Sequence, residues 1–231
     1  MLTCARQTKV RRECRPITAN ACQRRSGGFS LPEVLVTLAI MAALTVVVVP
    51  ALFSKLREGR ATAIMSSLSG INDAVGEFRK GVGRYPGQLT FLVSAPTALV
   101  GTDACGTVYT AAAAALWRGP YLTRNFPASG ITFGDAVLYP GVRRSPTTVA
   151  SPAPAIAFLI IDVGNVELQA VTIIDSEIDN GDGANAGTIR FTSDAIAAQT
   201  GAGVNQTAAI PAALADRRNL SYHIPINGGG C

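Results

Sequence analysis

A run of twenty almost continuously apolar residues, from 34 to 53, constrains this chain more than any other feature. As a helix it is about 30 Å long, enough to cross the hydrocarbon core of a membrane. Only Thr37, Thr45 and Pro50 interrupt it, and Glu33 directly precedes it. A carboxylate on a membrane helix costs free energy unless it is paired, so Glu33 predicts a partner charge. The alternative is a carboxylate that reaches the lipid headgroups from the end of an ordinary anchor helix.

Charge divides the chain at Gly28. Residues 1–28 carry seven basic side chains and one acidic side chain, whereas the remaining 203 residues carry 13 basic and 14 acidic ones. The basic character of the whole chain therefore belongs to its first segment, and no nucleic-acid partner is expected for the rest. Because basic residues stay on the cytoplasmic side of a membrane, the long C-terminal part is predicted to be exported.

The segment Gly27-Gly28-Phe29-Ser30-Leu31-Pro32-Glu33, with the apolar run behind it, resembles the N-terminal signal of type IV pilins and of type II secretion pseudopilins. In that family a prepilin peptidase cuts the bond that corresponds to Gly28–Phe29 and methylates the new amino group of Phe29. Counted from Phe29, Glu33 is the fifth residue and Pro50 the twenty-second, where family members carry these residues. The new amine, with a reference pKa of about 7.7 to 8, is largely cationic at neutral pH.

The resemblance also implies how the chain assembles. The amine of one subunit neutralises Glu33 of a neighbouring subunit while a filament grows, so Glu33 and Pro50 are assembly residues. The implied partners are the prepilin peptidase, further pilin or pseudopilin subunits in a homopolymer, and an inner-membrane assembly platform. We therefore expect a cleaved leader at 1–28, a transmembrane and assembly helix at 29–54, and a periplasmic pilin-like head at 55–231. The expected location is the bacterial inner membrane and then a periplasmic pseudopilus or a surface pilus.

The apolar residues beyond the membrane segment recur mostly at intervals of three and four. They are Ala61, Ile64, Met65, Leu68, Ile71, Val75, Phe78 and Val82. This pattern predicts one long helix from about Ser30 to Lys80, ended by Gly81, Gly83 and the Tyr85-Pro86 pair.

The rest of the chain is expected to form a small antiparallel β-sheet that covers this helix, an α+β pilin fold. The β-prone runs 155–162 and 166–174, joined by Val163-Gly164-Asn165, predict a hairpin. Further strands are expected at 188–192, at 134–139 and, as an edge strand, at 222–226. We expect a short helix at 88–94 and a loose loop with some helix at 194–216.

The cysteines divide at the same point as the charges. Cys4, Cys14 and Cys22 lie in the leader, which leaves Cys105 and Cys231 in the exported part. In an oxidising periplasm two such cysteines predict a disulfide. The alternative is a pair of free thiols.

Four carboxylates occur within eight residues, at Asp175, Glu177, Asp179 and Asp182. The predicted strands place this stretch in a loop between them. Clustered carboxylates are ligands that Ca²⁺ prefers, although the spacing is not that of an EF-hand. Major pseudopilins of type II secretion carry a calcium site in a loop late in their sheet, but its ligands do not align residue by residue with these four carboxylates. The alternative is a solvated acidic turn.

A second resemblance concerns the kind of filament. Tyr85-Pro86, followed later by Trp117-Arg118-Gly119-Pro120-Tyr121-Leu122, is similar to a region of the major type II pseudopilin. This favours a pseudopilin, whereas a major or minor pilin of a type IV pilus, for adhesion or motility, is the alternative. A DNA-uptake pilin ranks last because the head has only two adjacent arginine pairs, at 143–144 and 217–218. Whatever the subtype, Trp117 and Tyr121 are expected to pack in the core.

The sequence does not favour an enzyme. Its only histidine, His223, has Ser221 two residues away, a strand separation of about 6 to 7 Å, which is too long for a hydrogen bond between nucleophile and base. No glycine-rich loop is followed by Lys-Ser or Lys-Thr, as a phosphate-binding loop would require.

Overall fold

The computed structural model describes residues 29–145, 156–198, 200–201, 204–205 and 209–227. The chain divides into two compact units, Met1–Val47 and Val48–Cys231. The helices are α1 (Leu31–Val82), the 3-10 helix η1 (Leu89–Leu92), α2 (Ala111–Ala115) and α3 (Leu168–Asp179). The strands are β1 (Ile131–Phe133), β2 (Ala136–Ser145), β3 (Ile156–Glu167), β4 (Ile189–Thr192), β5 (Thr200–Gly201), β6 (Val204–Asn205) and β7 (Arg217–Asn227).

The long helix predicted from the apolar pattern is confirmed as α1. It begins with Leu31, and Pro32 and Glu33 lie in its first turn, where a missing N–H is tolerated and a negative charge is favoured by the helix dipole. Its end is marked by Gly83, whose φ of 80° suits glycine and whose N–H donates to the carbonyl oxygen of Arg79 at 2.8 Å. All the predicted stripe residues are buried except Met65, which is half-buried, and Ala74 joins them.

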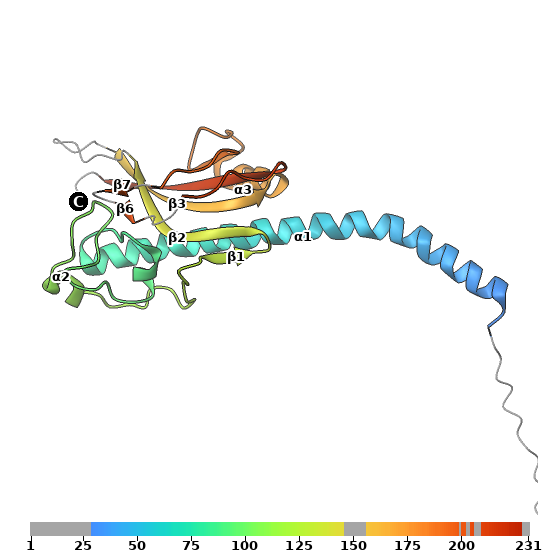
Figure 1. Cartoon of the computed structure of the whole chain (residues 1–231), viewed down its shortest axis with the longest axis horizontal. Helices are drawn as coiled ribbons and strands as arrows, with labels where there is room; N and C mark the ends of the chain where they lie inside the picture. Colours follow the sequence, from blue (N-terminus) through green and yellow to red (C-terminus); the bar gives the residue numbers. More distant parts are fainter. Residues whose placement is uncertain (1–28, 146–155, 199, 202–203, 206–208, 228–231) are drawn as a thin grey trace, which may run out of the picture. The chain divides into compact units, whose positions relative to one another are not determined.

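Five strands form one antiparallel sheet in the order β1-β2-β3-β7-β4 (Figure 1). The prediction of an edge strand at 222–226 is wrong, because β7 lies between β3 and β4. Its outer neighbour β4 is short, pairs with residues 219–222, and confirms the strand expected at 188–192. The strand expected at 134–139 is found as the first part of a longer one, β2.

The predicted hairpin over 155–174 is wrong. β3 continues through Val163-Gly164-Asn165, where the pairing with β7 shifts register and Asn165 adopts a φ of 59°. The second half of the expected hairpin is instead the helix α3, which buries Ala170, Val171 and Ile174 at intervals of one and three residues. Burial of this helical face outweighs the strand preference of its β-branched residues.

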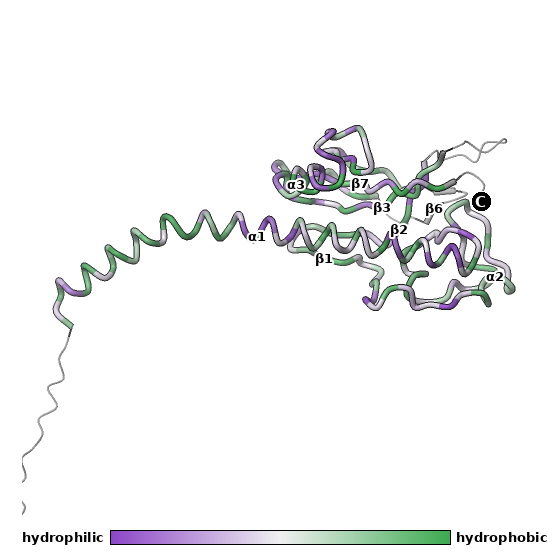
Figure 2. Tube along the Cα trace, turned by 180° about the vertical axis from the view of Figure 1, so that it is seen from behind, coloured by the Kyte–Doolittle hydropathy of each residue, from purple (hydrophilic) through white to green (hydrophobic). Residues whose placement is uncertain are grey.

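One hydrophobic core joins the second half of α1, the sheet and α3. It contains Ile64, Leu68 and Phe78 of α1 together with Leu159 and Ile161 of β3. Figure 2 shows the change along α1, from a mostly hydrophobic first part to one in which polar and apolar residues alternate. An α+β pilin-like fold, with a long N-terminal helix packed on an antiparallel sheet, is confirmed.

Of the two helical segments predicted outside α1, one is present and the other is not found in the described residues. The short helix expected at 88–94 is present as η1, with Leu89 and Leu92 fully buried. The helix expected within 194–216 is absent from the described part of that segment, which contains β5, β6 and an isolated bridge between Ile196 and Ile210. These two isoleucines are buried, so they attach the segment to the head.

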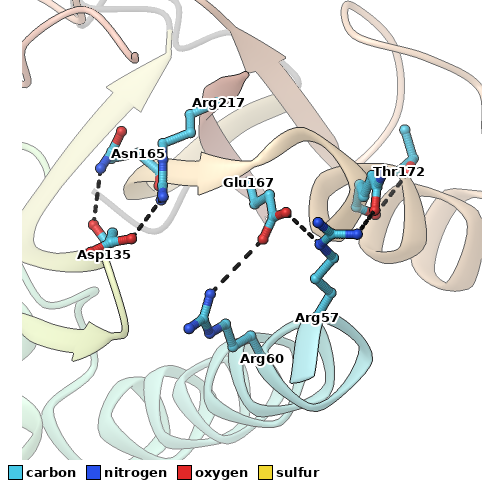
Figure 3. A network of polar contacts seen from close by, with 8 residues as sticks. Arg57, Arg60, Asp135, Asn165, Glu167, Thr172 and Arg217 are labelled. Carbon is cyan, nitrogen blue, oxygen red and sulfur yellow. Dashed lines mark hydrogen bonds and ion pairs between the residues drawn. The ribbon is translucent and has the colours of Figure 1, made fainter. Parts of the chain in front are cut away.

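Polar contacts hold the start of the head portion of α1 against β3 and α3 (Figure 3). Arg57 forms an ion pair with Glu167 at 2.6 Å and donates to the side-chain oxygen of Gln169 at 2.7 Å. Arg60 lies 3.9 Å from the same glutamate. These contacts lie where the apolar stripe of α1 begins.

Candidate functional site

The N-terminal segment exposes its apolar side chains. No residue from 29 to 56 is buried, and Phe29 is 82 % exposed. Among the described residues, α1 is the one helix long and apolar enough to cross a membrane. Such a surface has to be covered by lipid or by other protein chains.

The predicted assembly residues occupy particular positions on α1. Glu33 lies exposed in the first turn, four residues after Phe29, and Pro50 lies inside the helix. Pro50 has no N–H to donate, so the helix lacks one hydrogen bond there. The other side of the expected cleavage site, Gly28, lies outside the described residues.

The acidic stretch is not a loop between two strands, as the sequence suggested. Asp175 and Asp179 lie one turn apart on α3, and Asp182 follows in the connection to β4. One carboxylate oxygen from each of these three lies within 4.8 Å of the others. Glu177 is exposed and is not part of this group.

Two further observations bear on what the acidic group can do. Asp175 is 6 % exposed, and its Oδ1 has no hydrogen-bond partner within the described part of the chain. The desolvation of Asp182 and the charges of Asp179 and Asp175 raise the pKa of Asp182. A bound cation would relieve both the repulsion and the unpaired buried oxygen.

The backbone approaches this acidic group closely at Gly187. A Cβ there would lie 2.5 Å from the Oδ2 of Asp182 and 2.6 Å from the Oδ2 of Asp179, and the φ of Gly187 is 66°. The same Asp179 oxygen accepts a hydrogen bond from the N–H of Ile189. A side chain at this position would have to displace both carboxylates and adopt a left-handed backbone, so glycine is favoured there, which the sequence alone did not reveal.

Of the two cysteines in the predicted disulfide, one lies within the described residues and one does not. Cys105 is buried in the turn after Asp103, whose carboxylate accepts from the N–H of Cys105 at 2.9 Å. Cys231 lies outside the described residues, as do the three leader cysteines. The pairing of Cys105 with Cys231 stays a prediction.

The aromatic residues of the second resemblance pack as expected. Trp117 and Tyr121 make an edge-to-face contact at 5.8 Å, and Tyr121 makes a similar contact with Phe78 of α1 at 5.7 Å. The indole N–H of Trp117 donates to the carbonyl oxygen of Phe91 at 2.8 Å. These rings attach the 117–122 segment to the core.

The hydroxyl of Ser221 makes its described hydrogen bonds to residues other than His223. The Ser221 hydroxyl donates to Asp162 at 2.7 Å and accepts from Arg143 at 3.0 Å, and Arg143 in turn holds Asp162 through two hydrogen bonds. Sequence reasoning missed this buried group. Its signal is an aspartate within an apolar strand, because a charge there requires a partner.

Comparison with known proteins bears on the N-terminal segment alone. No curated protein and no solved structure matches the chain. Residues 23–49 match the prokaryotic N-terminal methylation motif, and this match covers Phe29, Glu33 and most of the apolar run. The chain thus carries an N-terminal methylation motif, consistent with the prepilin signal of type IV pilin-like proteins.

Proposed function

We propose that this chain is a structural filament subunit, a pseudopilin, of a system like type II secretion. The observation that carries the proposal is the methylation motif at residues 23–49, joined to a helix with an exposed apolar surface. In the filament, that surface would pack against the same segment of other subunits. The head would face the periplasm, and no catalytic role is expected for it.

Processing would begin the chain's function. Cleavage between Gly28 and Phe29 and methylation of the new amine would place a positive charge four residues before Glu33. The amine of one subunit would then pair with Glu33 of another. Such a pair would fix the register between subunits, as buried polar residues do in coiled coils.

The test of processing is the intact mass and N-terminal sequence of the chain isolated from its native membrane. We expect a start at N-methylated Phe29, and for Gly28→Val a start that includes the leader. If the wild-type chain from cells with active peptidase starts at Met1, the proposal is wrong. A non-reducing mass two hydrogens below the reduced one would support the Cys105–Cys231 disulfide.

Assembly is tested with Glu33→Gln, which removes the charge and keeps the shape. Filaments detected by crosslinking in cells should be lost, although the chain is still cleaved and inserted. Glu58→Gln on the same helix is the matched control, because Glu58 is exposed and pairs only locally with Lys55, at 2.7 Å. Equal assembly of both variants would contradict the role of Glu33.

Deletion of the gene distinguishes the two kinds of filament. Loss of protein secretion with surface pili intact would support the pseudopilin. Loss of adhesion or motility with secretion intact would support the alternative, a type IV pilus subunit. The similarity of Tyr85-Pro86 and 117–122 to the major pseudopilin favours the first outcome.

We further propose that the head binds calcium through Asp175, Asp179 and Asp182. The unpaired buried oxygen of Asp175, and the approach of one oxygen from each of the three carboxylates to within 4.8 Å of the others, support an ion there. Calcium at 100 times its dissociation constant should stabilise the head by about 2.7 kcal/mol. Asp175→Asn should abolish this gain, whereas Glu177→Gln, just outside the group, should keep it. A chain whose unfolding is the same in calcium and in EDTA would overturn the site.

A further inference from the structure

A cavity of about 400 Å³ lies over the sheet on the face turned away from the hydrophobic core. The side chains of Ile160, Ser221 and His223 line it, and they alternate along β3 and β7 with core residues such as Ile161 and Ile224. The segment that follows β4 covers part of it with Ile196. The volume is that of a small-molecule site.

The walls of this cavity carry positive charge. Arg143 of β2, its neighbour Arg144, and Arg190 of β4 line it, and no aspartate or glutamate is among its described lining residues. Asp162 lies beneath, 1 % exposed, and neutralises Arg143 through the paired hydrogen bonds described above. That pair holds Arg143 in place. Arg190 adds a positive charge that Asp162 does not pair with. An acidic group that it influences is Asp182, outside the cavity lining, where desolvation raises the pKa and the charge of Arg190 lowers it.

One long hydrogen bond connects the guanidinium of Arg190 to the rest of the head. Its Nε donates to the carbonyl oxygen of Gly187 at 3.4 Å, the only hydrogen bond of its guanidinium among the described residues. The side chain is half-buried. A partly desolvated guanidinium with few partners is suited to a carboxylate or a phosphate, whose oxygens match its geometry.

His223 supplies a second polar atom. Its side chain is 7 % exposed, its ring contacts Phe158 edge-on at 5.6 Å, and its Nδ1 has no partner within the described residues. Burial, and then the charges of Arg190 and Arg143, lower the pKa of His223 to about 4. At neutral pH it is therefore an uncharged ring with one N–H to donate.

We propose that this cavity binds a small oxyanion, a phosphate or a carboxylate, through Arg190 and His223. The site would be separate from filament assembly, since it uses no residue of the N-terminal segment. A cavity of about 400 Å³ is large enough for a phosphate or a small organic acid. Arg143, fixed by Asp162 and Ser221, would add positive potential without moving.

The test uses the mature full-length chain in detergent micelles, without a histidine tag. His223 is the only histidine, so ¹³C labelling at Cε1 of the histidine ring gives one resonance. Inorganic phosphate, and acetate in a second titration, are added at pH 7 with sodium chloride adjusted to constant ionic strength. We expect a saturable shift of the resonance by at least one of them, with a dissociation constant at or below about 1 mM.

Arg190→Gln should weaken binding at least tenfold, whereas Arg118→Gln, at an exposed arginine outside the cavity, should not change it. Asn185→Asp adds a negative charge to the cavity rim at an exposed position, so it should fold and should also weaken binding; Asn125→Asp is its control. The proposal is overturned if neither anion shifts the resonance beyond sodium chloride, or if both cavity variants bind as tightly as their controls.

Discussion

The two halves of α1 differ in how their side chains are covered, although they belong to one continuous helix. From 31 to 56 every residue is exposed, and from 61 to 82 eight residues are buried against the head. Apart from the hydrogen bond missing at Pro50, both halves satisfy most of their backbone groups within the helix, which is why an apolar segment can remain helical in lipid. The apolar side chains of the first half therefore have to be covered by the surroundings of the chain, whereas those of the second half are covered by the chain's own head.

The largest expected effect distinguishes these halves directly. Phe78→Ala removes a fully buried ring that contacts Tyr109 and Tyr121, and it should destabilise the head by about 3 to 5 kcal/mol. Leu44→Ala, at a residue 61 % exposed in the first half, should leave head unfolding unchanged. Urea unfolding in micelles, followed by the fluorescence of Trp117, measures both. Equal destabilisation by the two changes would contradict the comparison.

A second effect belongs to the head alone and depends on pH. The pKa of His223 in the folded head, about 4, is below the usual value of 6.5, so the unfolded chain binds the extra proton between these values. Stability contributed by the neutral ring is therefore present above pH 6.5 and is lost as the pH falls toward 4. We expect a loss on the order of 2 kcal/mol from this group. His223→Asn should show a correspondingly smaller fall in stability over that range, and an unchanged pH profile would refute the assignment.

A smaller, stabilising effect is expected inside the buried half. Nothing lies within 4 Å of a Cβ placed on Gly76, which is helical and close to Phe78. Gly76→Ala should raise the free energy of unfolding by up to about 1 kcal/mol, because alanine has the higher helix propensity. Gly187→Ala is the contrasting change, since its Cβ would collide with two aspartates, and it should destabilise the head. The same urea titration distinguishes the two.

The smallest effect concerns the polar contacts at the boundary between the halves. Glu167→Gln removes the ion pairs with Arg57 and Arg60, whose side chains are 35 % and 45 % exposed. Partly exposed pairs of this kind contribute about 0.2 to 1 kcal/mol and weaken as salt is added. A loss above 2 kcal/mol that is insensitive to salt would mean that this contact, and not the apolar stripe, holds the helix to the head.

Most of the architecture could be predicted because its signals are local. The stripe from Ala61 to Val82 recurs with the helix period, so α1 and its buried face follow from spacing alone. The region 155–174 could not be assigned in this way. Val171, Thr172 and Ile173 have the branched side chains that strands favour, and α3 forms because its buried face meets a core contributed by distant strands.

The candidate sites divide in the same manner. Phe29 and Glu33 could be predicted as site residues because a methylation motif is a linear sequence pattern. Asp175, Asp179 and Asp182 were found as a cluster, but the separation of Glu177 from it depends on the helical turn of α3. The cavity beside Arg190 and His223 was not predicted, since its walls come from strands that are adjacent only in the folded sheet.

By itself the sequence determined the apolar segment, its methylation motif and the length of α1, because continuous hydrophobicity, charge and helical period act between near neighbours. Only the tertiary structure decided the strand order, the helical state of 168–179 and the position of the buried Arg143–Asp162 pair. These depend on the free energy of burying groups from distant parts of the chain together, which no local pattern contains.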